Sequence, residues 1–200
     1  MEADHGDLFV VRSYPKKRGR NAAPAKNRKR PVITVRSRPG HPSQGLLNVD
    51  GAVFPCALGR GGISADKREG DGATPLATMR LVCGFFRRGS FQARSSLPLK
   101  PIGPSLGWCE VPDDRNYNRP VKMPYRASHE RMLREDGLYD ACIVLDWNLR
   151  PRRRGRGSAI FFHLARPGYT PTQGCVAVGR AVMARLLPRL SRATALKVTR

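Results

Sequence analysis

The chain has 200 residues, 40% of them hydrophobic, and its 37 Lys and Arg against 15 Asp and Glu give a net charge of +22. This length suits one domain with a buried core, and the hydrophobic fraction excludes a wholly disordered chain. The charge favours anionic partners, whether nucleic acid, acidic lipid or a carboxylate-rich polymer.

Cysteine spacing and hydropathy argue against several further classes of protein. The five cysteines lie far apart and form no C-x-x-C pair, which argues against a zinc ribbon or a thioredoxin-like motif. No apolar stretch approaches the roughly 20 residues of a membrane-spanning helix. The N-terminal apolar run, Leu8 to Val11, is shorter than the core of a signal peptide, about 7–15 residues. The sequence as written therefore predicts neither a membrane span nor an export signal.

The first third of the chain is predicted to hold a tail, a strand and a hairpin. Residues 1–31 include "KKRGRNAAPAKNRKR", which shows no periodicity and predicts a basic flexible tail, either a leader or a nucleic-acid-binding arm. "PVITVRSR" alternates like an edge strand and opens a domain over residues 32–199. In "QGLLNVDGAVFPCALGR", Asp50-Gly51 predicts a type I′ turn between two strands.

The middle of the chain is predicted to be less regular. A glycine-rich loop precedes a strand from Met79 to Phe86, and it lacks the Gly-Lys-[Ser/Thr] and the following helix of a phosphate-binding loop. Residues 87–127 are rich in Pro and Gly and are predicted to be largely irregular. Ser128 is then predicted to cap a short helix, His129 to Asp136.

The last third is predicted to contain four strands and one helix. "LYDACIVLDWN" and "GSAIFFHLA" have the composition of buried strands, Val176 to Val178 forms a brief one, and "TALKVT" closes the domain. "RAVMARLLPRL" places apolar residues at helical spacing. The fold class that follows is mainly β, a β-rich α+β single domain with short helices.

The strand "SAIFFH" carries the first candidate catalytic residue. Alternation places Ala159, Phe161 and His163 on one face and Ile160 and Phe162 on the other. Since both faces are apolar, the pattern predicts a central buried strand with His163 at its exit, where the imidazole reaches a cleft.

The loop after this strand brings a thiol behind a glycine. The segment "TQGC" ends at Cys175, and Gly174 lets a substrate carbonyl approach the backbone. A free thiol has a pKa of about 8.5 and is mostly protonated at neutral pH. A neighbouring imidazole that takes its proton would leave an ion pair with a nucleophilic sulfur. The backbone N–H groups of Gly174 and Cys175 are the predicted oxyanion donors.

These segments together resemble the L,D-transpeptidase (YkuD-like) catalytic domain. In that family a strand-ending His is followed by a loop and [Ser/Thr]-x-Gly-Cys-[Ile/Val], places held here by His163 and by Thr172 to Val176. "GRGGISADKREGDGATPL", "GWCEVPDDRNYNRPV" and "LYDACIVLDWN" extend the likeness over about residues 32–199. The resemblance implies a YkuD-like β-sandwich, with Cys175 and His163 as catalytic residues and neither a metal nor a cofactor.

The chain departs from the family pattern at two places. Many members have His before the Gly-Cys where this chain has Gln173, and many have Arg or Asn where it has Ala177. The first departure leaves His163 as the single base of the motif, and the second removes an expected contact to a substrate carboxylate. Thr172, Gln173 and Tyr169 are the candidate substrate-binding residues. Asp113, Asp114 and Asp140 are candidates for orienting the imidazole, and the sequence does not select among them.

The function implied by the resemblance is a cysteine-dependent transpeptidation of peptidoglycan stem peptides through a thioacyl-enzyme. The acceptor, an amine of a second stem, a protein lysine, a D-amino acid or water, stays open. One alternative is a hydrolase that uses the same site to cut cross-links or anchors. Another is a non-catalytic basic module that binds polyanions. The resemblance implies carbapenem-type inhibitors and a location in the cell envelope, with the cytoplasm as the alternative because no export signal is visible. A nucleic-acid partner is not expected, and the oligomeric state stays open.

Overall fold

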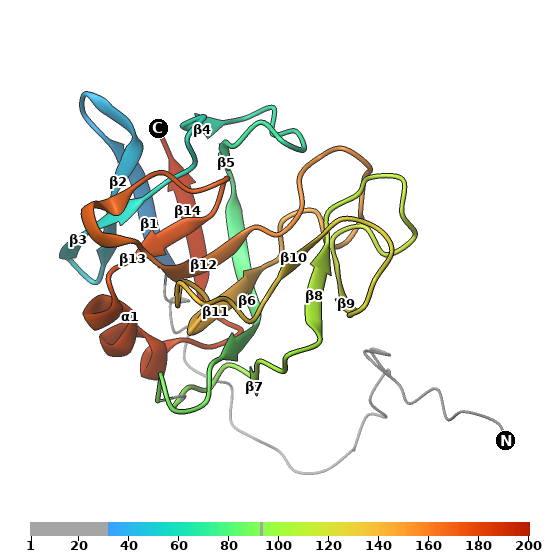
Figure 1. The fold of residues 1–200 in the computed structure, drawn as a ribbon. Coiled ribbons are helices and arrows are strands. Elements are labelled where there is room, and N and C mark those ends of the chain that lie inside the picture. The colour runs from blue at the N-terminus through green and yellow to red at the C-terminus, as the bar shows by residue number, and fades with distance from the viewer. Residues whose placement is uncertain (1–31, 93) are drawn as a thin grey trace, which may run out of the picture.

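Strands are the main regular structure of the described chain, which is residues 32–92 and 94–200 of a computed structural model (Figure 1). The predicted tail, residues 1–31, lies outside the described residues. The strands are β1 (Val32–Arg38), β2 (His41–Val49), β3 (Ala52–Ala57), β4 (Ile63–Ser64), β5 (Thr74–Pro75), β6 (Thr78–Phe86), β7 (Leu99–Pro101), β8 (Leu106–Cys109), β9 (Arg119–Lys122), β10 (His129–Arg131), β11 (Ala141–Leu145), β12 (Phe161–Leu164), β13 (Val176–Val178) and β14 (Ala195–Thr199). The helices are α1 (Arg180–Leu186) and the 3₁₀ turns η1 (Pro167–Tyr169) and η2 (Leu187–Arg189).

The main sheet closes on itself. Its strand order is β11-β12-β13-β3-β2-β1-β14-β6-β7, and β6 also pairs with β11. A three-stranded sheet, β10-β8-β9, and a two-stranded one, β4-β5, complete the fold. The mainly β fold class is therefore confirmed, with the two faces of the expected sandwich joined by continuous hydrogen bonding.

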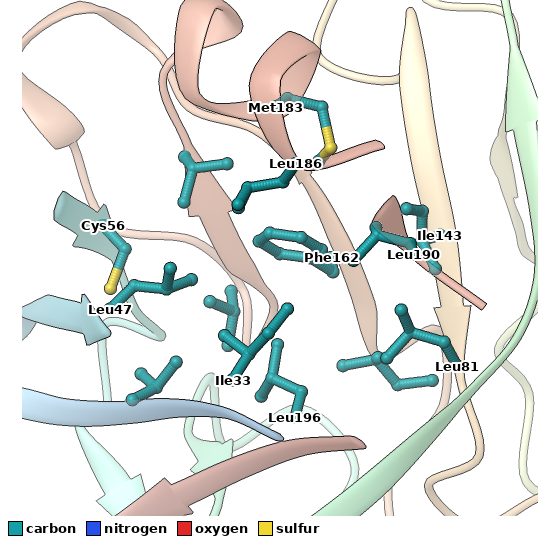
Figure 2. Packing of buried hydrophobic residues seen from close by; sticks show 14 of the residues in the cluster. Ile33, Leu47, Cys56, Leu81, Ile143, Phe162, Met183, Leu186, Leu190 and Leu196 are labelled. Carbon is teal, nitrogen blue, oxygen red and sulfur yellow. The ribbon is translucent and has the colours of Figure 1, made fainter. Parts of the chain in front are cut away.

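The core lies between these faces and under α1. Figure 2 shows Met183 and Leu186 of α1 pointing toward Phe162 of β12, with Ile33 of β1 and Leu196 of β14 on the other side. All five side chains are buried. Because α1 directs its apolar stripe onto the sheet, it fixes the strand pair β12–β13 from one side and leaves the opposite face of that pair for a site.

Several predicted elements are confirmed. The hairpin β2–β3 turns at Asp50 and Gly51, both with positive φ (49° and 86°), as a type I′ turn requires. β13 has the predicted bounds, and β12 is buried on both faces between β11 and β13.

Other predictions are wrong. β1 is not an edge strand, because β2 and β14 pair with its two sides. The segment from His129 forms β10 instead of a helix; it pairs with β8, and the Ser128 hydroxyl donates to Glu110 at 2.6 Å rather than capping a helix. Residues 87–127 hold three short strands, β7, β8 and β9. Ala159 has φ 51° and precedes β12 rather than belonging to it. Within the described residues, no helix is both long enough and apolar enough to span a bilayer.

Candidate active site

The parallel pair β12–β13 brings the predicted histidine and cysteine to one face. Its register sets Phe162 beside Val176 and His163 beside Ala177. Cys175, one residue before β13, is therefore next to Phe161 and shares its face with His163. Both side chains line one cavity of about 420 Å³. Of the five cysteines, all free thiols, only Cys175 lines this cavity.

The backbone before and within β12 holds the Cys175 sulfur. The Phe161 N–H donates a hydrogen bond to Sγ at 3.3 Å, and the thiol donates to the Ala159 carbonyl at 3.2 Å. Only 6% of Cys175 is exposed. In the described part of the chain the His163 imidazole is not among the hydrogen-bond partners of Sγ. The resting thiol therefore keeps its proton and donates it to the Ala159 carbonyl, while the imidazole lines the same cavity.

His163 is oriented by the backbone rather than by an aspartate. Its Nδ1 lies 2.9 Å from the Leu164 carbonyl oxygen, and because a carbonyl only accepts, Nδ1 carries the proton. Nε2 is then the unprotonated nitrogen, with a lone pair available to accept a proton. The Tyr139 ring packs edge-on against the imidazole with centroids 5.1 Å apart. Asp140, one of the sequence candidates, instead pairs with Arg180 at 2.5 Å.

Burial keeps both groups uncharged before substrate binds. It raises the pKa of the Cys175 thiol to about 12, with the nearby Glu130 carboxylate adding to the effect, and lowers the pKa of His163 to about 4. The resting state is thus a neutral thiol and a neutral imidazole, and not the ion pair that the sequence predicted.

The neutral buried imidazole predicts a loss of stability in acid. The pKa of His163 is about 4 in the folded protein against 6.5 for an exposed imidazole, so between these pH values the unfolded chain binds a proton that the folded protein does not. As the pH falls through this range, the free energy of unfolding should decrease by about 3 kcal/mol. Urea unfolding at pH 7 and pH 4.5 should show this decrease in the parent and a smaller one in His163→Gln. Equal decreases in both proteins would contradict the burial of an uncharged imidazole.

Thr172 fixes the loop that carries the thiol. Its N–H donates to Leu58 at 2.8 Å and its carbonyl accepts from Arg60 at 2.9 Å, which ties the loop to the end of β3. Its hydroxyl donates to the Cys175 carbonyl at 2.7 Å and accepts from the Gly174 N–H at 3.2 Å. Thr172 lines the cavity, but its hydrogen bonds stabilise the loop. Of the two predicted oxyanion donors, the Gly174 N–H is already hydrogen-bonded to Thr172 at rest.

Gly174 occupies a position that a side chain would disrupt. Its φ is 128°, and a Cβ there would lie 2.8 Å from the Ala73 carbonyl oxygen. We expect Gly174→Ala to cost about 1–3 kcal/mol of stability and to displace Cys175, which should reduce turnover. Gly40→Ala is the matched control, because Gly40 also has positive φ (76°) but nothing within 4 Å of its would-be Cβ. Thermal unfolding and activity of the two variants check this, and equal effects would contradict a steric role for Gly174.

The other predicted residues divide between cavity and surroundings. Gln173 and Ala177 line the cavity, and Ala177 is fully buried beside His163 in the register of β12 and β13. Tyr169 is not among the lining residues; its hydroxyl would lie 3.1 Å from a Cβ on Gly179. The structure therefore does not bring Tyr169 into the site.

The sequence does not predict the remaining lining of the cavity. It carries three carboxylates, two guanidinium groups and a phenol: Glu69, Glu110, Glu130, Arg134, Arg166 and Tyr139. Glu110, Glu130 and Arg134 come from the segments predicted to be irregular or helical, and Glu69 and Arg166 come from loops. Tyr139 comes from the predicted strand "LYDACIVLDWN". For the five charged residues the one sequence signal is their charge, which surface residues commonly share.

Comparison with known proteins identifies the family of the chain. The family model YkuD, described as the L,D-transpeptidase catalytic domain, matches residues 43–198, which include β12, β13 and every residue of the cavity. Comparisons with curated proteins and with solved structures gave no match. Because the family model spans most of the chain, this protein belongs to the YkuD family of L,D-transpeptidase catalytic domains.

Proposed function

We propose that the protein is a cysteine-dependent acyltransferase, an L,D-transpeptidase that acts on peptidoglycan stem peptides through a thioester on Cys175. The observation that carries the proposal is one cavity that holds the thiol and an imidazole with a free Nε2 on the same strand-pair face. Family membership supports the substrate class. Peptidoglycan stems carry several carboxylates, and Arg166, which lines the cavity and uses Nη2 for its ion pair with Asp136, has further N–H groups suited to receive one.

In the first half-reaction the Cys175 sulfur attacks the carbonyl of the diaminopimelate residue in a tetrapeptide stem. His163 Nε2 accepts the thiol proton as the C–S bond forms and then gives it to the nitrogen of the departing D-Ala. The Cys175 N–H is the proposed donor to the oxyanion, since the Gly174 N–H already bonds to Thr172. The Phe161 N–H, which points at Sγ, offsets the charge that develops on sulfur.

In the second half-reaction an acceptor resolves the thioester. An amine of a second stem gives a cross-link between third residues, whereas water gives a trimmed tripeptide. Mass spectrometry of the products of a purified tetrapeptide stem, with and without an added amine, tests the proposal. We expect D-Ala release together with an amine-dependent product. Trimming alone, unaffected by the amine, would show a hydrolase, and no D-Ala release would overturn the proposal.

The proposed location is the cell envelope, because peptidoglycan lies outside the cytoplasm. Carbapenem-type β-lactams are the proposed inhibitors, since their strained carbonyl suits attack by the Cys175 thiol. Cell fractionation followed by detection of the protein tests the location, and recovery in the cytoplasmic fraction alone would contradict it.

A further inference from the structure

Glu130 is a carboxylate of the cavity wall with a free oxygen. It lies on β10 and its Oε1 accepts a hydrogen bond from the Tyr139 hydroxyl at 2.6 Å and from Arg134 Nη1 at 3.4 Å. Both of these contacts are to Oε1, so within the described residues Oε2 is left for a ligand. The side chain is 25% exposed and lines the cavity that holds Cys175. Glu130 is thus held in place and still accessible to a substrate.

Glu130 is also close to the catalytic pair. Tyr139, whose hydroxyl it binds, packs its ring against the His163 imidazole. The negative charge of Glu130 contributes to the raised pKa of the Cys175 thiol, and both side chains line the same cavity. The carboxylate therefore shares the cavity in which the thioester would form.

The resolving step needs more proton acceptors than His163 supplies. An alkyl amine is an ammonium ion at neutral pH and has no lone pair with which to attack. It must lose one proton before attack and a second as the amide forms. His163 returns to its neutral form when D-Ala leaves, so it can take only one of the two. A second base must stand in the cavity if the acceptor arrives protonated.

We propose that the Glu130 carboxylate binds the ammonium group of the acyl acceptor and takes its first proton, so that the freed amine attacks the thioester on Cys175. This inference rests on the proposed function and selects protonated amines, rather than water, as the acceptors that the site is built to receive. Glu130 would then be a catalytic residue of the second half-reaction only.

The contacts of the other cavity carboxylates favour Glu130 as the group that accepts the proton. Glu69 accepts from the buried hydroxyl of Tyr117, and Glu110 accepts from Ser128. Neither contacts a residue that touches His163. The guanidinium of Arg134, which faces Glu130, is paired with Asp136 at 2.7 Å.

The environment of Glu130 also suits a proton acceptor. Burial raises its pKa, with smaller contributions of the same sign from Glu110 and Asp136, while Tyr139 and Arg134 oppose the rise. A carboxyl with a raised pKa is a stronger base than an exposed one. Because the chain has a net charge of +22, a carboxylate in the cavity also favours the approach of a cation to the thioester.

The proposed step balances in atoms and charge. The ammonium gives one proton to Glu130 Oε2, and the nitrogen lone pair forms the C–N bond to the thioester carbonyl. As the tetrahedral intermediate collapses, the C–S bond breaks, the nitrogen gives its second proton to His163 Nε2, and this proton returns to the sulfur. Glu130 releases its proton to water, so the net change is an amide bond and one proton in solution.

The test compares two acceptors on the same acyl-enzyme. A D-amino acid presents an ammonium group, whereas hydroxylamine presents an uncharged nitrogen at neutral pH and needs no first deprotonation. Mass spectrometry gives the ratio of the two products for the parent, Glu130→Gln and the control Glu135→Gln, an exposed glutamate outside the cavity. We expect Glu130→Gln to lower the D-amino acid product relative to the hydroxylamine product by about a hundredfold. Glu135→Gln should leave the ratio unchanged.

The outcomes separate this inference from the proposed function. Because the ratio is taken from one acyl-enzyme, a change in the rate of its formation cancels. Glu130→Asp, which restores a carboxylate, should recover part of the ratio, and it serves as the second variant if Glu130→Gln folds poorly. Equal ratios in the parent and Glu130→Gln would overturn the role of Glu130 alone. Failure of the parent to release D-Ala would overturn the proposed function instead.

Discussion

Cys175→Ala is expected to abolish the release of D-Ala from a tetrapeptide stem. The substitution removes the one thiol that lines the cavity. Cys142, which pairs with His163 across β11 and β12, is fully buried and does not line the cavity. Loss of the nucleophile in enzymes of this chemical type lowers turnover by about 10⁶-fold, which here means background. The fold should persist, because the sulfur makes only two weak hydrogen bonds to the backbone.

The control for this result is Cys83→Ala. Cys83 is a partly buried free thiol outside the cavity, so its loss should leave D-Ala release near the parent rate. A chromogenic assay for free D-Ala, with circular dichroism to confirm folding, checks both variants. Substantial D-Ala release by folded Cys175→Ala would show that another group attacks the stem.

His163→Gln is expected to slow formation of the acyl-enzyme by about 10²–10⁴-fold, the usual contribution of a general base. Glutamine retains an N–H group that can donate to the Leu164 carbonyl, but it offers no basic nitrogen to the thiol. Attack would then depend on thiol that ionises by itself. Because the thiol pKa lies at about 12, the acylation rate of the variant should rise about tenfold per pH unit.

Single-turnover acylation measured between pH 6 and pH 9 distinguishes this role from a structural one. A merely structural contribution of His163 would lower the rate by a constant factor at every pH. An acylation rate in His163→Gln that is close to that of the parent and equally independent of pH would contradict the role of Nε2 as the base.

The sequence predicts those elements whose determinants are local. The Asp50-Gly51 hairpin depends on two residues that tolerate positive φ, and α1 depends on apolar residues at helical spacing. The strand with His163 was predictable because both of its faces are apolar over successive residues. The juxtaposition of His163 and Cys175 was predictable only with the help of the family motif.

The parts that the sequence does not predict depend on long-range pairing. β1 alternates as an edge strand would, yet β14, more than 150 residues away, pairs with its free side. The sequence predicts a helix for the segment that contains Glu130, because no local sequence pattern indicates that β8 pairs with this segment. The group that orients His163 is a backbone carbonyl, which no side-chain pattern can reveal.

The residue types also do not predict that the Cys175 thiol and the His163 imidazole are both uncharged at rest. A Cys beside a His forms an ion pair where water or fixed donors stabilise both charges. Here Cys175 is only 6% exposed, and the negative charge of Glu130 further raises the pKa of its thiol. Both conditions oppose a thiolate at rest, so the reactivity of Cys175 is expected to appear when a substrate carbonyl takes up the developing charge.

The most direct test of the central claim is the intact mass of the protein after a brief reaction with a tetrapeptide stem, followed by peptide mapping of the adduct. The account predicts a covalent tripeptide stem, formed with loss of D-Ala, on the peptide that contains Cys175. The adduct should be removed by hydroxylamine, as a thioester is. An adduct on any other residue, or stem turnover with no covalent adduct in a rapidly quenched reaction, would contradict it.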